Sequence, residues 1–115
     1  MRAFYITAQG KTEIREVAEP TIGPGDVLLR MQYVGYCGSD LNTYRGLNPM
    51  VALPRIPGHE ISAVIEAVGD DVPESWQPGT AVTLSPYTSC GVCPSCRSGR
   101  VNCCRDNQTL GVQRD

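Results

Sequence analysis

The chain has 115 residues, a formal net charge of −2 at pH 7 and a hydrophobic fraction of 41%. This length supports one domain with a modest core and leaves no room for a second full domain. No window approaches the roughly 18 apolar residues of a membrane span, and the first ten residues lack the apolar run of a signal peptide. The sequence therefore predicts a cytoplasmic protein with no membrane partner.

The basic residues do not indicate a nucleic-acid partner. Only one of the ten is a lysine, and three arginines, Arg97, Arg100 and Arg105, cluster in the last quarter of the chain. Nucleic-acid surfaces combine a larger basic excess with interleaved aromatic side chains. We therefore interpret the cluster as a solvated face.

Short apolar and β-branched runs predict strands in the first third of the chain. Residues 1–7 and 12–17 flank Gln9-Gly10-Lys11 and predict a hairpin. Residues 19–26 are rich in proline and glycine and predict a loop. Residues 27–36, VLLRMQYVGY, then predict a long strand.

The middle of the chain predicts one short helix and two further strands. Residues 39–45 are the predicted helix, with Ser39 or Asp40 available as its cap. Residues 59–68 tolerate either state, but β-branched residues dominate their middle and favour a strand. Residues 81–84 predict a last short strand. The predicted fold class is mainly β with short helices, arranged as a small barrel.

Five of the six cysteines lie in a short segment, which we call the cysteine lobe (residues 88–106). Cys90, Cys93 and Cys96 follow the spacing C-x2-C-x2-C, and Cys104 comes after seven further residues. Tetrahedral zinc takes four thiolates at roughly 2.3 Å, and turns can bring these sulfurs that close. In a reducing compartment, clustered cysteines are more often metal ligands than disulfides. The lobe therefore predicts a structural zinc site.

Several alternatives stay open from spacing alone. Either Cys103 or Cys104 could supply the fourth thiolate. Iron with the same sulfurs, two disulfides or plain buried thiols are the competing interpretations. A ferredoxin-like run would carry proline after its last cysteine, where Arg105 stands here. A redox role is disfavoured because we expect no helix start near Cys90 to lower a thiol pKa.

The sixth cysteine and the only histidine each lie in a short polar motif. Cys37 lies in Gly-Tyr-Cys-Gly-Ser-Asp, and His59 lies in Gly-His-Glu with Gly69 and Val72 beyond it. Taken singly, each has an ordinary structural explanation. Together with the cysteine lobe, their order and separation resemble the zinc-dependent medium-chain alcohol and polyol dehydrogenases across essentially all 115 residues.

This resemblance implies a GroES-like β-barrel catalytic domain with two zinc ions, one structural and one catalytic. It implies that Cys104 is the fourth structural ligand and that Cys103 is spare. It also implies that Cys37 and His59 bind the catalytic zinc, with Glu60 as a direct or alternating third ligand. Ser39 would relay the substrate proton, and Asp40 would orient the histidine.

The sequence departs from the family pattern at three positions. Asn42 stands where many relatives have a histidine that carries the proton to solvent, so the relay beyond Ser39 is open to question. Gly38 stands where some relatives have a basic residue that touches the cofactor phosphate. Ala63 replaces a glycine of the motif after Glu60, a change we expect to cost little.

Members of that family are about three times longer and carry a Rossmann domain for the cofactor. The only partial match to its glycine motif here is at residues 23–28, which contain a proline and lack the third glycine. We therefore interpret residues 1–115 as the N-terminal part of a dehydrogenase that oxidises a secondary alcohol, polyol or sugar acid. NAD(P) would bind only in the longer parent, and the 115-residue chain alone would be inactive.

The rival hypothesis is a non-enzymatic module, a zinc-stabilised β-barrel used as a scaffold or binding domain. Two zinc ions per chain favour the enzyme, and one favours the scaffold. The partner expected for the parent is a small-molecule alcohol or polyol. Unpaired strand edges would also permit a homo-oligomer.

Overall fold

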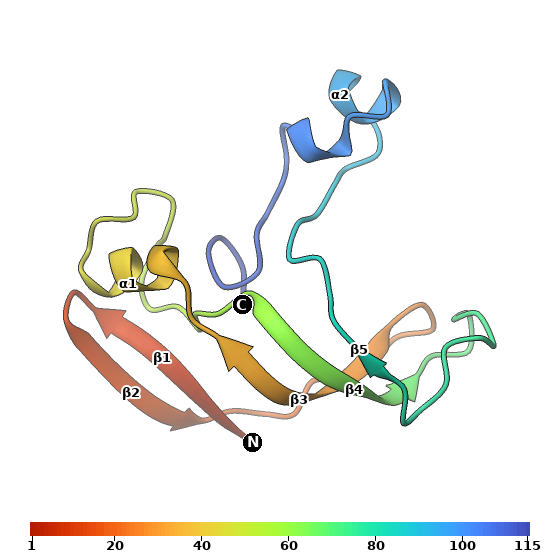
Figure 1. The fold of residues 1–115 in the computed structure, drawn as a ribbon, viewed down its shortest axis with the longest axis horizontal. Helices are drawn as coiled ribbons and strands as arrows, with labels where there is room; N and C mark the ends of the chain where they lie inside the picture. Colours follow the sequence, from red (N-terminus) through yellow and green to blue (C-terminus); the bar gives the residue numbers. More distant parts are fainter.

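The computed structural model describes all 115 residues and contains two antiparallel sheets and three short helical segments (Figure 1). The strands are β1 (Arg2–Ala8), β2 (Lys11–Glu16), β3 (Val27–Gly35), β4 (Glu60–Val68) and β5 (Ala81–Val82). The helical segments are α1 (Gly38–Tyr44), α2 (Pro94–Arg97) and the 3-10 turn η1 (Val101–Cys103). None of these helices has the length and apolar character that crossing a membrane requires.

The first sheet is the predicted hairpin of β1 and β2. Gly10 closes it with φ 69°, a left-handed conformation that glycine adopts at little cost. The Gly10 N–H also donates to the Tyr44 carbonyl at the end of α1, at 2.8 Å. The hairpin therefore holds the C-terminal end of α1, the helix that begins directly after Cys37.

The second sheet has the order β3-β4-β5, with β4 in the centre. Ile61, Ala63 and Ile65 of β4 are buried and alternate with more exposed residues, the period expected of a strand. The choice of strand over helix for residues 59–68 is confirmed. β5 is shorter than predicted and pairs with β4 through only two residues.

The predicted barrel is not closed. The hairpin and the three-stranded sheet share no ladder, and β3 and β5 are edge strands. Only 12 of 115 residues are buried, and the radius of gyration is 15.7 Å. A compact chain of this length would have a radius of gyration of about 13 Å. The strands present here are too few and too short to close on themselves, so both sheets keep open faces.

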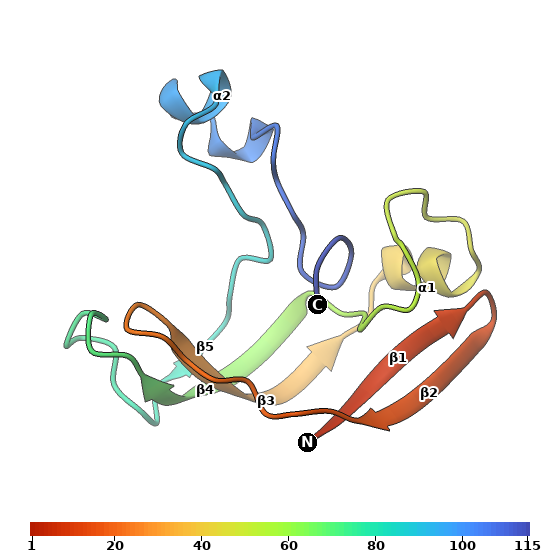
Figure 2. The same ribbon diagram turned by 180° about the vertical axis from the view of Figure 1, so that it is seen from behind.

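The cysteine lobe stands away from both sheets on a two-stranded stem (Figures 1 and 2). Tyr87 and Thr109 form a β-bridge in this stem, and the Leu110 N–H donates to the Pro86 carbonyl at 2.9 Å. Beyond the stem, the chain returns to the start of β4, where its C-terminal end lies (Figure 1). The lobe has a single attachment to the rest of the molecule.

The turn after β4 yields a test of the fold. A Cβ at Gly69 would collide with the backbone carbonyls of Gly23 and Pro24. Because backbone cannot move aside easily, Gly69→Ala should destabilise the chain by about 1–3 kcal/mol. Urea unfolding should show a lower midpoint with an unchanged slope.

Gly25→Ala in the facing loop is the matched control, since a Cβ there meets no atom within 4 Å. Equal midpoints for the two variants would contradict the packing described here.

Candidate metal centres

Cys37 links the end of β3 to the start of α1. It is the N-cap residue, with extended backbone, and its Sγ accepts the Ser39 N–H at 3.3 Å. The prediction that Ser39 or Asp40 caps the helix is therefore wrong. Asp40 occupies the third helical position instead and accepts the Cys37 N–H at 3.0 Å, which completes a capping box.

Asp40 also joins this helix to the loop that carries the histidine. Its side chain is 5% exposed, and its second oxygen, Oδ1, accepts the Gly58 N–H at 3.1 Å. A buried carboxylate is stable only when its oxygens receive such donors. The two bonds place the start of α1 against the residue that precedes His59.

The side chains of Cys37 and His59 meet at this junction. Cys37 Sγ lies 3.3 Å from His59 Nε2 and 2.9 Å from Ser39 Oγ. A sulfur and a nitrogen bound to one tetrahedral zinc ion would be about 3.6 Å apart. The separation in the structure is close to that value, so the pair fits a metal site.

The other nitrogen of His59 faces Asp40. Nδ1 lies 3.8 Å from Asp40 Oδ1 and is buried with no hydrogen-bond partner. An outer carboxylate that orients a ligating imidazole occupies this side of the ring in metal sites. Donor atoms of Cys37, Asp40 and His59 all lie within 4.8 Å of one another.

Glu60 lies outside this group. It is exposed, pairs with Gly35 across the β3-β4 ladder, and its side chain covers that glycine. A Cβ at Gly35 would lie 2.7 Å from Glu60 Oε2. The structure thus gathers Cys37, Ser39, Asp40 and His59 and leaves the Glu60 carboxylate apart.

A largely apolar cleft of about 610 Å³ opens beside Cys37, between β1 and α1. Burial, together with the nearby charge of Asp40, raises the pKa of Tyr36 on its wall. Gly38 lies at the cleft, and a Cβ there would meet no atom within 4 Å. The cleft is lined by Phe4, Ile6, Thr12, Tyr36, Cys37, Gly38, Asp40, Leu41, Tyr44 and Pro57.

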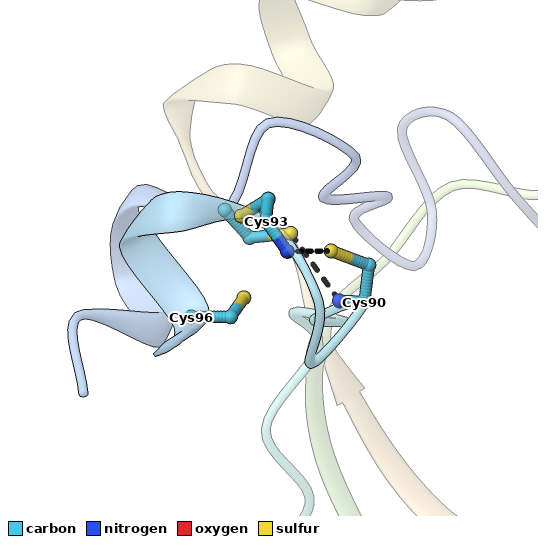
Figure 3. A group of neighbouring side chains, drawn as sticks. Cys90, Cys93 and Cys96 are labelled. Carbon is cyan, nitrogen blue, oxygen red and sulfur yellow. Dashed lines mark hydrogen bonds between the residues drawn. The ribbon is translucent and has the colours of Figure 1, made fainter. Parts of the chain in front are cut away.

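The cysteine lobe gathers four thiols. The sulfurs of Cys90, Cys93, Cys96 and Cys104 lie within 4.8 Å of one another, and none is in a disulfide. Figure 3 shows the first three of these side chains around the start of α2. Cys103 is exposed and lies outside the group, so the structure gathers Cys104 rather than its neighbour.

Backbone N–H groups point at these sulfurs. The Cys93 N–H donates to Cys90 Sγ at 3.3 Å (Figure 3). The Cys90 N–H donates to Cys104 Sγ, also at 3.3 Å. The Asp106 N–H donates to Cys104 Sγ at 3.4 Å. Such donors stabilise thiolate more than thiol, and thiolate is the form that binds zinc.

Two of the four thiols differ sharply in acidity. Backbone N–H groups of Arg105 and Cys96 lower the pKa of Cys93 to about 6, whereas burial raises the pKa of Cys96 to about 12. Several thiolates close together repel one another, which disfavours deprotonation of all four. A bound divalent cation offsets this repulsion. The donor set therefore fits a four-thiolate zinc ion.

One sequence expectation about this lobe is wrong. We expected no helix start near Cys90, but α2 begins at Pro94 with Cys93 as its N-cap residue. Proline at the first helical position is typical of such a start, and the Cys-Pro pair was the signal that the sequence offered.

Sequence reasoning also missed two residues that hold the histidine loop. Arg55 Nη1 donates to Asp115 Oδ1 at 2.8 Å, across 60 residues of chain. No spacing rule joins positions so far apart, and neither residue lies in a metal-ligand motif.

Comparison with known proteins identifies the family of this chain. Residues 23–113 match the family model described as the alcohol dehydrogenase GroES-like domain. A zinc-type alcohol dehydrogenase-like protein of Haemophilus influenzae is 36% identical over 115 residues, covering 100% of this chain and 34% of that protein. Sorbitol dehydrogenase of Halalkalibacterium halodurans is 40% identical over 118 residues, with the same coverage of 100% and 34%.

A solved structure shares the fold over the whole chain. An alcohol dehydrogenase of Escherichia coli CFT073, in complex with NADH, superimposes with a TM-score of 0.89 at 37% identity. The alignment covers 100% of this chain and 33% of that one. The chain thus spans about a third of the length of the relatives it matches. Since the family model covers most of its residues, this chain belongs to the alcohol dehydrogenase GroES-like domain family.

Proposed function

We propose that residues 1–115 are the N-terminal catalytic part of a zinc-dependent NAD(P) dehydrogenase that oxidises a secondary alcohol, polyol or sugar acid. The observation that carries this proposal is the 3.3 Å approach of Cys37 Sγ to His59 Nε2, with Ser39 Oγ beside the sulfur. Two ligand atoms and one proton acceptor meet at the edge of a cleft, as metal-assisted alcohol oxidation requires.

The domain boundaries are part of the proposal. Residues 1–115 would form a partial GroES-like catalytic domain, with the structural zinc lobe at about 88–106. Further residues of the full-length protein would close the barrel and supply the cofactor domain. Support comes from the open sheet faces and from relatives of which this chain covers about a third.

We assign Cys37 and His59 as ligands of the catalytic zinc and the four gathered cysteines as ligands of the structural zinc. Glu60 remains the proposed third catalytic ligand, although in this structure its carboxylate lies over Gly35. Its side chain would have to turn from that glycine toward the sulfur and imidazole. It stands next to His59 in the chain, which makes the turn a local one.

Each residue of the site has a definite task in the proposed reaction. Ser39 Oγ, beside the Cys37 sulfur, accepts the hydroxyl proton of the substrate and passes it outward. Asp40 holds the helix start and the His59 loop together and faces the histidine's Nδ1. Asn42 is exposed and cannot titrate, so the proton would continue from Ser39 to water.

Zinc and a nicotinamide cofactor would supply the remaining chemistry. Zinc held by Cys37 and His59 would be a Lewis acid that makes the substrate hydroxyl more acidic. A nicotinamide cofactor, bound outside these residues, would supply the hydride acceptor, so that the alcohol loses one hydride and one proton overall. The named activity of the sorbitol dehydrogenase relative supports a polyol substrate.

Metal content tests the two sites. The purified chain should bind two zinc ions, one in each cluster, because the two donor sets are separate. Cys37→Ser or His59→Gln should remove one ion, and Cys96→Ser should remove the other. Metal analysis after gel filtration measures the ratio.

Asn42→Ala, a change to an exposed residue of the same helix, should leave both ions bound. Glu60→Gln should weaken retention of the ion that depends on Cys37. A single ion lost only with Cys96→Ser would favour the scaffold hypothesis instead.

Chelation tests how the lobe is held. The only buried apolar residue in the lobe is Cys93, so its order must come from the metal. Structural zinc contributes roughly 10–16 kcal/mol in small zinc domains, against a stability of about 5–15 kcal/mol for a whole domain. Zinc removal should therefore abolish amide protection at residues 88–106.

Hydrogen exchange with and without chelator measures this effect, and the β3-β4 ladder serves as the internal reference. Unchanged exchange rates in the lobe would show that the thiols alone order it.

Kinetics of the full-length protein test the proton relay. Ser39→Ala should lower kcat by about 10²–10⁴-fold, the usual contribution of a positioned proton acceptor. Ser39→Thr keeps the hydroxyl and should retain most of the activity. Zinc content should stay unchanged in both variants.

A kcat of the Ser39→Ala variant equal to that of the wild type would remove Ser39 from the mechanism. The 115-residue chain alone should show no turnover, since its sheets are all antiparallel and it offers no Rossmann site.

A further inference from the structure

The loop of residues 55–58 leads directly into His59 and is held by a carboxylate far along the chain. Asp115 Oδ1 accepts the Ile56 N–H at 2.9 Å and Arg55 Nη1 at 2.8 Å. The Arg55 side chain is 13% exposed, and its Nε has no hydrogen-bond partner. Asp115 is thus the side-chain partner of a largely buried guanidinium, beside the backbone that precedes the histidine.

The same C-terminal segment touches the loop a second time, at Gly111. Gly111 has φ 74° and packs its backbone on that of Gly58. A Cβ at Gly111 would collide with the Gly58 carbonyl oxygen and lie 2.9 Å from the Gly58 nitrogen. Both glycines are buried. We call residues 109–115, which make these two contacts, the C-terminal latch.

Two further contacts complete the support of the loop. Arg55 and Ile6 of β1 exchange two backbone hydrogen bonds, at 2.9 and 3.0 Å. Asp40 Oδ1 accepts the Gly58 N–H at 3.1 Å. The loop is therefore held by β1, by α1 and by the C-terminal latch, and only the latch comes from the stem of the cysteine lobe (Figure 1).

We propose that Asp115 is a positioning residue for the Cys37–His59 metal site, and that it acts by fixing the loop that carries His59. The inference rests on the proposed function only in taking Cys37 and His59 as metal ligands. Without the Asp115 carboxylate, Ile56 loses its acceptor and Arg55 its counter-charge. The loop would then shift, and His59 Nε2 would lose its position relative to Cys37 Sγ.

Cobalt titration of the metal-free 115-residue chain tests this. Visible absorption distinguishes Co²⁺ bound by four thiolates from Co²⁺ bound by one thiolate and an imidazole, so the two affinities can be measured in one experiment. The variants are Asp115→Ala, which removes the acceptor, and Asp115→Asn, which keeps an oxygen for Ile56 and Arg55. Asp70→Asn, an exposed carboxylate with no side-chain partner, is the matched control.

Asp115→Ala should weaken Co²⁺ binding at the Cys37–His59 site by about tenfold, the lower end of the range for residues behind metal ligands. Affinity at the four-thiolate site should stay within about twofold, since distant sites respond independently. Asp115→Asn should recover most of the loss, and Asp70→Asn should match the wild type.

An unchanged affinity at the Cys37–His59 site of Asp115→Ala would overturn the inference. So would an equal loss at both sites, which would indicate general unfolding rather than positioning. If the wild-type chain takes up cobalt at the four-thiolate site alone, both the proposed function and this inference are wrong. If the wild type loads both sites and Asp115→Ala behaves the same, only the inference fails.

Discussion

The buried carboxylate of Asp40 is the contact on which the candidate site depends. One of its oxygens accepts the Cys37 N–H and the other accepts the Gly58 N–H, so a single side chain fixes two segments that are far apart in sequence. The cost of leaving that charge unpaired in the interior enforces both bonds at once. The approach of Cys37 to His59 follows from this arrangement, because Cys37 supplies one of the two donors and His59 directly follows the other, Gly58.

The rest of the molecule relies little on a hydrophobic core. Few residues are buried, and many large apolar side chains remain exposed, on the strands as well as on the loops and short helices. Polar contacts with defined partners therefore do much of the positioning, including the capping box of α1 and the N–H donors around the lobe sulfurs. A fold of this kind suits the proposed role as one part of a longer chain, in which other residues cover the open faces.

The sequence was most informative where chemistry requires particular residues at fixed spacing. The spacing of Cys90, Cys93 and Cys96 predicted a metal site but left Cys103 and Cys104 as alternatives for the fourth ligand. The resemblance to the dehydrogenase family then pointed to the side chains that the structure gathers in the two clusters. The strand at 59–68 followed from its β-branched middle. Within each motif and within the strand, the informative residues lie close together in the sequence, where a pattern can be recognised.

Features that depend on contacts between distant segments were not predictable in the same way. Cys37 rather than Ser39 caps α1, because Asp40 is used as the reciprocal acceptor. The barrel does not close within these residues, since closure depends on pairing partners that local pattern cannot reveal. The Glu60 side chain lies over Gly35, a cross-strand contact set by the register of β3 and β4. The hydrogen bond from Arg55 to Asp115 joins two residues that share no sequence motif.

The single stem of the cysteine lobe has a thermodynamic consequence. The stem is the only connection between the lobe and the two sheets, and the segment beyond it packs on Gly58. Loss of order in the lobe would therefore leave the β3-β4 ladder and the two bonds of Asp40 in place. Unfolding of the chain is then expected to occur in two steps, so that a single melting temperature would not describe the molecule.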